Sequence, residues 1–407
     1  MLTRRHLLCC GAAAGLFSAL TQPARAGLLN PCRSGIPQAL QPLLDATFSG
    51  LDPHQLWDMH THLLGTGDSG SGCTVNAQLN QWWHPVEMLR KRVILNAACV
   101  PGAAPSVDRA YVERLRALAD DFPAGARWML FAFDQACDAA GRPHAAHTTF
   151  HVPNAYAAHI AAEHPARFAW VASIHPYRPD ALARLDAALA QGAVALKWLP
   201  SSMNIDLRDA RLRPFYDRLA AARLPVIVHC GEERAVPGAG RDELGNPLLV
   251  RAPLQHGVRV IVAHCASLGD SLDLDQRRPQ EVPAFSLFAR LMDEDWGGRL
   301  LGDISAVLLR NRPPEVVRTL LTRSDWHPRL LHGSDYPLPG IPAAVNLPAL
   351  VAAGLLQAGN VAPLTALREY NPLLFDLALK RAVGWRGAQL SPAVFATRPH
   401  LERLPVA

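Results

Sequence analysis

Two histidines separated by one residue are the feature of this sequence that points most directly to chemistry. Residues 58–62 read DMHTH and close a short apolar run. Side chains alternate between the two faces of a β-strand, so His60 and His62 point to one side while Met59 and Thr61 point to the other. Two imidazoles on one side of a strand can chelate one cation. Such a pair alone is only moderately specific, because the chain contains 17 histidines.

Three further apolar runs end in groups that can bind a metal. His229 closes VIVH, His264 closes VIVAH and Asp335 closes LLHGSD. If these runs are parallel strands of one barrel, their carboxyl ends meet at the mouth where active sites form. Histidines combined with an aspartate suit Zn²⁺ or a similar divalent ion and leave positions open for water. The spacing therefore predicts a metal centre at one end of the barrel, with His60, His62, His229, His264 and Asp335 as candidate ligands.

Lys197 ends another apolar run, ALKWL, and would be buried there. An unpaired ammonium in such a place is costly, so it needs a partner or a modification. Carbamylation would turn Lys197 into an anionic bridge between two metal ions. Alternatively, its head reaches solvent or a carboxylate at the strand end. Both interpretations stay open, and so does the choice between one and two ions.

The elements that must position these residues form a regular alternation. Eight short, mostly apolar runs are typical of strands buried on both faces. They are residues 56–63, 128–134, 168–175, 192–199, 225–230, 259–265, 300–306 and 330–335. Helical patterns lie between them, at residues 107–119, 154–164, 179–191, 209–223 and 314–322. This order predicts an α/β fold, specifically a (β/α)8 TIM barrel. An open doubly wound sheet is the alternative, but no GxGxxG turn follows the first run.

The length beyond a minimal barrel lies in long insertions that follow predicted strands and in a helical C-terminal tail. The insertions are residues 64–100, 135–153, 231–247 and 336–347. All four follow strand ends, so they are expected to shape the active-site face. No linker interrupts the pattern, and residues 27–407 are therefore interpreted as a single domain.

The first 26 residues are predicted to be a twin-arginine signal peptide. Arg4 and Arg5 precede a short apolar stretch, and residues 24–26 read ARA, a small-residue cleavage site. The apolar stretch is short for a membrane span. Export to the periplasm is therefore expected, and the mature chain is expected to have no stable membrane span.

The net charge limits the possible partners, and the cysteine spacing limits the possible disulfides. The net charge is +5 and no basic stripe stands out, so a nucleic-acid partner is not expected. Six cysteines lie beyond the signal peptide, without a CxxC pair or a compact disulfide framework. Cys230 and Cys265 each follow a histidine of the predicted centre and are interpreted as small buried residues rather than ligands.

These motifs resemble those of the amidohydrolase superfamily, in the amidohydrolase-related branch that contains aminocarboxymuconate semialdehyde decarboxylase. The resemblance runs from residue 56 to about residues 371–372 and rests on DMHTH, ALKWLP, VIVHCGEE, VIVAHCAS and HGSDYP. It implies that His60, His62, His229 and Asp335 are metal ligands. It also implies that His264 binds a second metal or acts in catalysis, and Lys197 resembles the carbamylated lysine of two-metal members.

The predicted function is a metal-dependent hydrolase that uses a metal-activated water to cleave an amide, lactone or ester bond of a small molecule. Asp335 would accept the proton of that water and pass it to the leaving group, while His264 would polarise the substrate carbonyl. A decarboxylase or hydratase on the same scaffold is the alternative. A non-catalytic periplasmic binding protein fits less well, because the ligand set is complete. A homo-oligomer is compatible with the sequence.

Other polar and aromatic residues carry weaker signals. A lyase would need an arginine for the substrate carboxylate, with Arg241, Arg251 and Arg310 as candidates, although surface positions suit all three better. His144, His147 and His151 are interpreted as a lid or surface segment rather than a metal cluster. Trp82 and Trp83 would line the pocket or simply pack the first insertion. Glu232, Glu233 and Asp303 are candidates for residues that orient the ligands.

Overall fold

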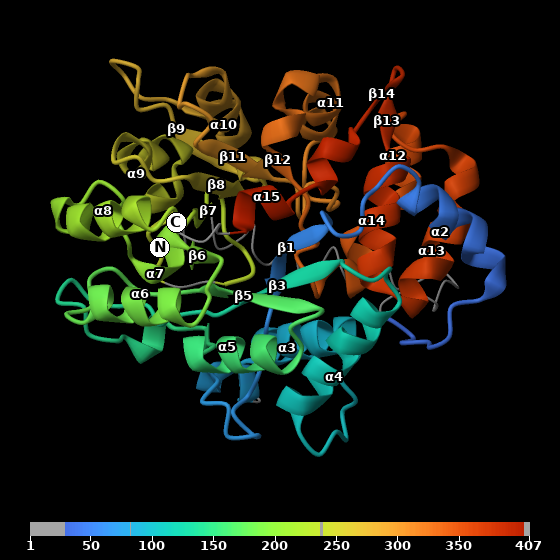
Figure 1. Ribbon diagram of the computed structural model, residues 1–407, viewed down its shortest axis with the longest axis horizontal. Helices are drawn as coiled ribbons and strands as arrows, with labels where there is room; N and C mark the ends of the chain where they lie inside the picture. The colour runs from blue at the N-terminus through green and yellow to red at the C-terminus, as the bar shows by residue number, and fades with distance from the viewer. Residues whose placement is uncertain (1–28, 82, 237–238, 403–407) are drawn as a thin grey trace.

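Eight parallel strands form one sheet in the order β1-β3-β5-β6-β7-β8-β11-β12, at the centre of a ring of helices (Figure 1). The computed structural model describes residues 29–81, 83–236 and 239–402. The strands are β1 (Trp57–His62), β3 (Arg127–Phe131), β5 (Phe168–Ala172), β6 (Ala195–Trp198), β7 (Val226–His229), β8 (Val260–Ala263), β11 (Leu300–Asp303) and β12 (Leu330–Leu331). Each lies within one of the eight predicted apolar runs or starts one residue before it, so the barrel prediction is confirmed.

Alternating side chains of each strand fill two separate layers of the core. On β3, Met129 and Phe131 point into the barrel, where they join Ile227 and Ile261 in an inner cluster. Trp128 and Leu130 belong instead to the outer cluster, beneath the helices. Burial on both faces explains why these strands are continuously apolar in sequence.

The barrel closes between its last strand and its first. The backbone N–H of Met59 on β1 donates to the His332 carbonyl at 3.1 Å, just beyond β12. Further along, Thr61 and Tyr336 form a parallel bridge. The chain after β12 therefore runs beside β1, which brings Asp335 next to the two histidines of that strand.

Helices cover the outside of the sheet, and the predicted helical segments are all confirmed. The covering helices are α4 (Val107–Asp120), α5 (Asn154–Glu163), α6 (Ala181–Ala190), α8 (Arg213–Ala221), α9 (Arg251–Gln255), α10 (Ala284–Asp293), α11 (Pro314–Thr322) and α14 (Pro372–Ala382). The helix expected over residues 209–223 is shorter than predicted, because residues 210–212 form a 3₁₀ turn before α8.

The predicted C-terminal tail is helical. It contains α12 (Leu347–Ala352), α13 (Val361–Tyr370), α14 and the short α15 (Arg398–Leu401). Leu401 of α15 is buried in the inner cluster of the barrel. Nearby, the Trp57 backbone N–H donates to the Thr397 hydroxyl at 2.9 Å. The tail thus plugs the end of the barrel where the strands begin, opposite the predicted site.

The N-terminal part of the described chain and the first insertion are tied together. A disulfide joins Cys32, which precedes helix α2 (Gln41–Phe48), to Cys99, which follows helix α3 (Pro85–Ala97). The sequence did not predict α3 within the insertion. Cys230 and Cys265 are buried free thiols, as predicted. The predicted signal peptide lies outside the described residues. None of the described helices is long and apolar enough to span a bilayer.

Three pairs of short strands complete the fold. They are the antiparallel pairs β2 (Thr74–Val75) with β4 (Phe150–His151), β9 (Asp270–Leu272) with β10 (Glu281–Pro283), and β13 (Gly384–Trp385) with β14 (Ala388–Gln389). The first pair joins the insertions after β1 and β3. A short helix, α7 (Pro200–Met203), follows β6.

Candidate active site

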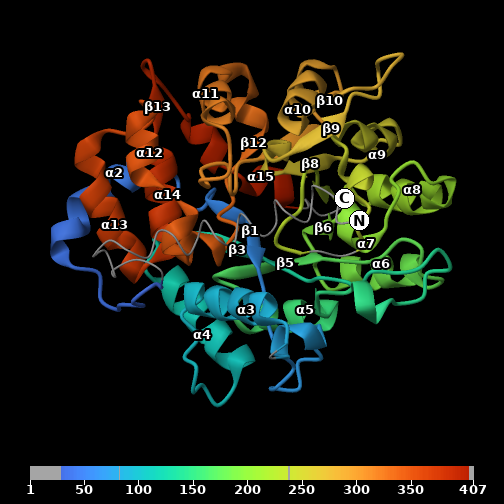
Figure 2. The same cartoon turned by 180° about the vertical axis from the view of Figure 1, so that it is seen from behind.

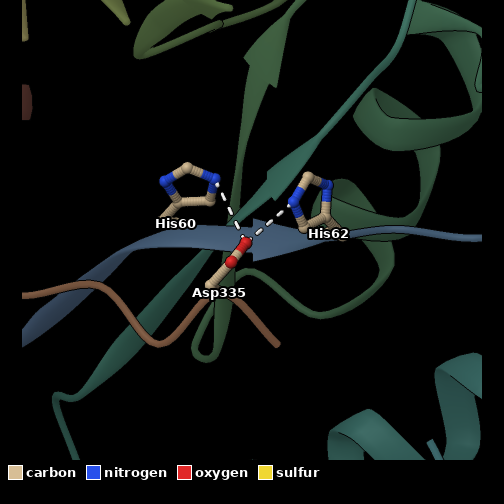
Figure 3. Close-up of side chains that lie close together, drawn as sticks. All are labelled: His60, His62 and Asp335. Carbon is tan, nitrogen blue, oxygen red and sulfur yellow. Dashed lines mark hydrogen bonds and ion pairs between the residues drawn. The ribbon is translucent and has the colours of Figure 1, made fainter. Parts of the chain in front are cut away.

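The two histidines of β1 converge on one carboxylate (Figure 3). His62 Nε2 lies 3.0 Å and His60 Nε2 lies 3.5 Å from Asp335 Oδ1. Asp335 has a left-handed backbone, with φ 60°, and its N–H donates to the His60 carbonyl at 2.8 Å. That turn aims the carboxylate back over β1. The predicted convergence of His60, His62 and Asp335 therefore exists in the structure.

The second ring nitrogen of His60 is held by a buried carboxylate. His60 Nδ1 forms a short contact with Asp303 Oδ2 at the end of β11. The other oxygen of Asp303 accepts the Ser305 backbone N–H at 2.6 Å. A carboxylate that fixes the outer nitrogen of a ligand histidine orients the ring and sets its tautomer. Asp303 thus has the contact expected of a ligand-orienting residue.

The hydrogen bond between His60 and Asp303 shows whether a cation fits beside Asp335, because it determines which nitrogen of His60 carries the proton. An ionised Asp303 only accepts hydrogen bonds, so Nδ1 of His60 carries the proton and Nε2 presents a lone pair. Burial, then the nearby Lys197, lowers the pKa of His60 well below its usual value. A neutral imidazole would then point its lone pair at Asp335 Oδ1. Two electron-rich atoms facing each other across 3.5 Å are repulsive unless a cation binds both. His60, His62 and Asp335 therefore fit a divalent metal ion.

His264, which follows β8, completes the inner wall of the site. Its ring stacks on His60 with centroids 4.8 Å apart, and its Nε2 lies 4.0 Å from Asp335 Oδ2. Its Nδ1 bonds Ser305, 2.8 Å from the hydroxyl and 3.1 Å from the carbonyl oxygen. His264 and the two residues after it all have φ between 50° and 54°. Such successive left-handed residues are costly and mark a turn imposed by its surroundings.

The structure places the predicted ligand His229 differently. Its Nε2 faces Glu233 Oε2 at 3.3 Å, and its ring lies 5.3 Å from that of His264. Two groups of three potential ligand atoms lie within 4.8 Å of one another in the described chain. They are His60–His62–Asp335 and His60–His264–Asp303. His229 belongs to neither group, so its role as a ligand stays a prediction. In this arrangement Glu233 faces the ring nitrogen, although that nitrogen has no hydrogen-bond partner among the described residues.

Lys197 reaches into the same site from β6. Its ammonium is buried, 5.4 Å from the centre of the Phe131 ring. Among the described residues, Nζ has no hydrogen-bond partner. It therefore reaches neither solvent nor a carboxylate within hydrogen-bond distance, which were the simpler expectations. Burial lowers the pKa of Lys197 to about 8. Lys197 therefore still needs a partner or a modification, such as carbamylation by carbon dioxide.

A pocket opens above these residues and is enclosed by the insertions. The insertion after β1 supplies Leu64, Leu79 and Ile94, and the one after β3 supplies Phe150. Val236 comes from the insertion after β7, and Leu338 comes from the segment that follows Asp335. The prediction that all four insertions shape the site is confirmed. The pocket therefore combines mostly apolar walls with a polar floor.

Arg312 is a charged pocket residue that the sequence pattern did not single out. The proposed Arg241 pairs with Glu243, Arg251 bonds Asp275 at 2.6 Å, and Arg310 is exposed. Arg312 instead lines the pocket, where burial lowers the pKa of its guanidinium to about 10. Its Nε has no hydrogen-bond partner among the described residues. The signal was its place after the seventh predicted strand, on the face where active sites form.

The remaining weak candidates lie away from the pocket floor. His144 and His147 stack on each other with ring centroids 4.0 Å apart. His151 bonds the Phe133 carbonyl through Nδ1 at 2.7 Å. Glu232 pairs with Arg234 at 2.8 Å at the rim of the pocket. Trp83 is exposed, and Trp82 lies outside the described residues.

A barrel of eight parallel strands, with histidines on the first strand and an aspartate after the last, defines a class of barrel enzymes with a metal-binding mouth. A model of the amidohydrolase family matches residues 57–369. The chain belongs to that family. Among proteins with curated functions, no match was found.

Several solved structures are similar in fold at low sequence identity. An uncharacterised TIM-barrel protein from Bordetella bronchiseptica is 18% identical, with a TM-score of 0.47, over 77% of this chain and 99% of that one. The 5-carboxyvanillate decarboxylase LigW from Sphingomonas paucimobilis is 13% identical, with a TM-score of 0.45, over 84% and 95%. The apo IDCase from Metarhizium anisopliae is 15% identical, with a TM-score of 0.44, over 88% and 98%.

Proposed function

We propose that this chain is a metal-dependent hydrolase that cleaves an amide, lactone or ester bond of a small molecule. The observation that supports it best is the pair of histidine nitrogens facing Asp335 Oδ1 at 3.0 and 3.5 Å. A divalent ion held there, with Zn²⁺ the best match to this ligand set, would supply a Lewis acid and an acidified water. His60, His62 and Asp335 would hold it, and His229 would join by turning away from Glu233.

The residues of the chain divide the remaining tasks. Asp335 Oδ1 faces the histidines, which leaves Oδ2 to accept the proton of the attacking water and return it to the leaving group. His264 lies 4.0 Å from Oδ2. His264 can take two tautomers: with the proton on Nε2 it would polarise the substrate carbonyl, and with the proton on Nδ1, which then donates to the Ser305 carbonyl, Nε2 would offer a lone pair to a metal ion. The apolar insertions exclude water and hold the organic part of the substrate.

A lyase acting on a carboxylate is the second candidate, and Arg312 is the observation that favours it. A cationic side chain at an apolar pocket wall suits a carboxylate on the substrate, since a guanidinium can bind both oxygens. Decarboxylation or hydration would use the same floor of histidines and Asp335. Release of carbon dioxide or addition of water to a double bond, followed together with hydrolysis products, separates the two candidates.

Metal analysis and an activity screen test the proposal. We expect the purified chain to contain at least one equivalent of zinc or a similar ion, and to lose activity on chelation and regain it on metal addition. The screen would cover amides, lactones, esters and aromatic or unsaturated carboxylates. The decisive variant is Asp335→Asn: if it kept its full metal content and near-normal turnover, the proton-shuttle role would be refuted. A chain that binds well under one equivalent of metal, without gain of activity on metal addition, would refute the enzyme itself.

A further inference from the structure

Helix α3 exposes a row of large apolar side chains beside the pocket. Trp83, just before the helix, is 58% exposed, and Val86 and Leu89 are 64% and 61% exposed. Residues three or four apart share one side of a helix, so Val93, which is half-buried, continues the same row. Seven large apolar side chains are exposed in the described chain, and three of them belong to this row. The row is therefore a concentrated apolar surface.

Basic side chains border this row. Helix α3 contains three consecutive basic residues, Arg90, Lys91 and Arg92, and one acidic residue, Glu87. Glu87 pairs with Arg90 at 2.8 Å. Lys91 donates to the neutral Asn80 side chain at 2.6 Å, and Arg92 forms no ion pair with any described residue. At 100° per residue, Arg90 and Arg92 lie on opposite sides of the apolar row. The surface is thus apolar along its centre, with Arg92 at one edge and the Arg90–Glu87 ion pair at the other, and with three basic residues against one acidic residue the helix is cationic overall.

The other side of α3 belongs to the active-site pocket. Arg90, Lys91, Ile94 and Leu95 line that pocket. The helix lies across the lower part of the barrel, near the viewer in Figure 2. At its C-terminal end, the Asn30 backbone N–H donates to Asn96 Oδ1 at 2.8 Å. Leu29, next along the chain, is 58% exposed and adds to the apolar surface there.

We propose that this face of α3 docks on a membrane surface rich in anionic phospholipid. An exposed apolar row with a tryptophan at one end, on a helix with three basic residues and one acidic residue, suits a helix that lies in the interface plane. The apolar side chains would enter the acyl boundary while the basic side chains reach the lipid phosphates. A second copy fits less well, because a two-fold contact through α3 would place the basic triplets against each other. Docking would bring the pocket mouth to the bilayer, whatever reaction the site performs.

Vesicle binding tests this proposal with a matched control. The wild-type chain and the variant Val86→Asp/Leu89→Asp would be mixed with phosphatidylglycerol/phosphatidylcholine vesicles and with pure phosphatidylcholine vesicles, then sedimented. The control is Leu182→Asp/Leu272→Asp, which places two aspartates at exposed leucines outside α3. Any contribution of the N-terminal segment is common to all three chains. Circular dichroism and melting curves would establish that each variant is folded.

The expected result is a partition coefficient that falls about tenfold or more for the α3 variant and is unchanged for the control. Binding should require phosphatidylglycerol and weaken at high salt, as electrostatic attraction does. Equal binding of the α3 variant and the wild type would overturn the proposal, and so would absence of wild-type binding to anionic vesicles. A concentration-dependent dimer that only the α3 variant abolishes would overturn it in favour of a second copy.

Discussion

The disulfide between Cys32 and Cys99 constrains the part of the chain that builds the active-site mouth. Its ends are 67 residues apart, and the closed loop contains β1 with both histidines as well as α3. Cys99 directly follows the last turn of α3, which lines the pocket. Breaking this bond is therefore expected to destabilise the fold and to loosen the pocket wall.

The size of the effect follows from the loop length. In the chain-entropy model, closing a loop of 67 residues in the unfolded state stabilises the native state by about 4 kcal/mol at 25 °C. The entropy of unfolding is about 2.1 cal/mol/K per residue, or about 0.8 kcal/mol/K for about 370 residues. Dividing the two gives a fall in Tm of about 5 °C when the bond is removed.

Scanning calorimetry of three samples measures this effect. They are the oxidised wild type, the wild type in reductant, and the variant Cys32→Ser/Cys99→Ser. The reduced wild type and the variant should melt at similar temperatures, both about 5 °C below the oxidised protein. Reductant should leave the variant unchanged, which controls for effects on the four buried free cysteines.

Two results would refute the reasoning. If the oxidised wild type and the double variant melted at the same temperature, the bond would be absent or energetically neutral. If reductant lowered the Tm of the variant as much as that of the wild type, the reductant would act elsewhere. Because disulfides persist in oxidising compartments, a formed bond would also support the export that we propose from the N-terminal sequence. Cell fractionation with thiol labelling checks that export directly.

Three further predictions concern the site itself. Asp303→Asn should lower metal affinity about 10- to 100-fold, because His60 loses the partner that sets its tautomer; competition with a chelator measures this. Arg312→Leu should lower kcat/KM for an anionic substrate about tenfold or more, by loss of a charged hydrogen bond, and spare an uncharged analogue. Lys197 has a folded pKa of about 8, below its unfolded value. The unfolded state then holds the extra proton between pH 8 and pH 10.5, so the stability of metal-free protein should rise with pH across that window. Denaturant titration should show this rise in the wild type and not in Lys197→Met; a flat wild-type profile would indicate a modified or partnered amine.

The barrel was predictable because its physical requirements are visible in the sequence. Most strands are apolar on both faces; His62 and His229 end their strands and His264 follows one, whereas β1 is the exception with Asp58, His60 and Thr61 inside it. Parallel strands bring those ends to one mouth, so the convergence with Asp335 follows from topology alone. The topology does not determine which nitrogen of each histidine ring faces which neighbouring residue. For example, the turn after β7 brings the Glu233 carboxylate within 3.3 Å of His229 Nε2, a local contact that the order of the strands does not predict.

The insertions were not predictable in the same way. Helix α3 has a single fully buried residue, Ala97, and its other apolar residues are divided between the pocket and the exposed row, so its sequence shows no single buried face of the kind that predicts a helix. Six cysteines allow fifteen pairings, and only the fold brings Cys32 to Cys99. Arg312 and Arg310 differ by two residues in sequence, and the path of the loop alone decides which one enters the pocket.

Behind the metal-binding face, a buried carboxylate fixes the backbone of two site segments. One oxygen of Asp58 accepts the Ser334 backbone N–H at 2.8 Å and the His60 backbone N–H at 3.1 Å. It thus joins β1 to the turn that carries Asp335. Burial raises the pKa of Asp58 to about 6. The first residue of the DMHTH motif therefore acts through the backbone of the ligands, a role that its place before the histidines does not reveal.

The C-terminal helix α14 completes this support from outside the family match, which ends at residue 369. The buried ammonium of Lys380 donates to the Gly333 carbonyl and to Asp376, both at 2.6 Å. Gly333 is two residues before Asp335, so α14 holds the turn that aims the proposed metal-binding carboxylate. Burying a lysine and an aspartate is costly unless each is bonded, and here both are. The free-energy cost of burying Lys380 and Asp376 is explained if this pair positions Asp335. Helix α14 is then part of the structure that supports the site.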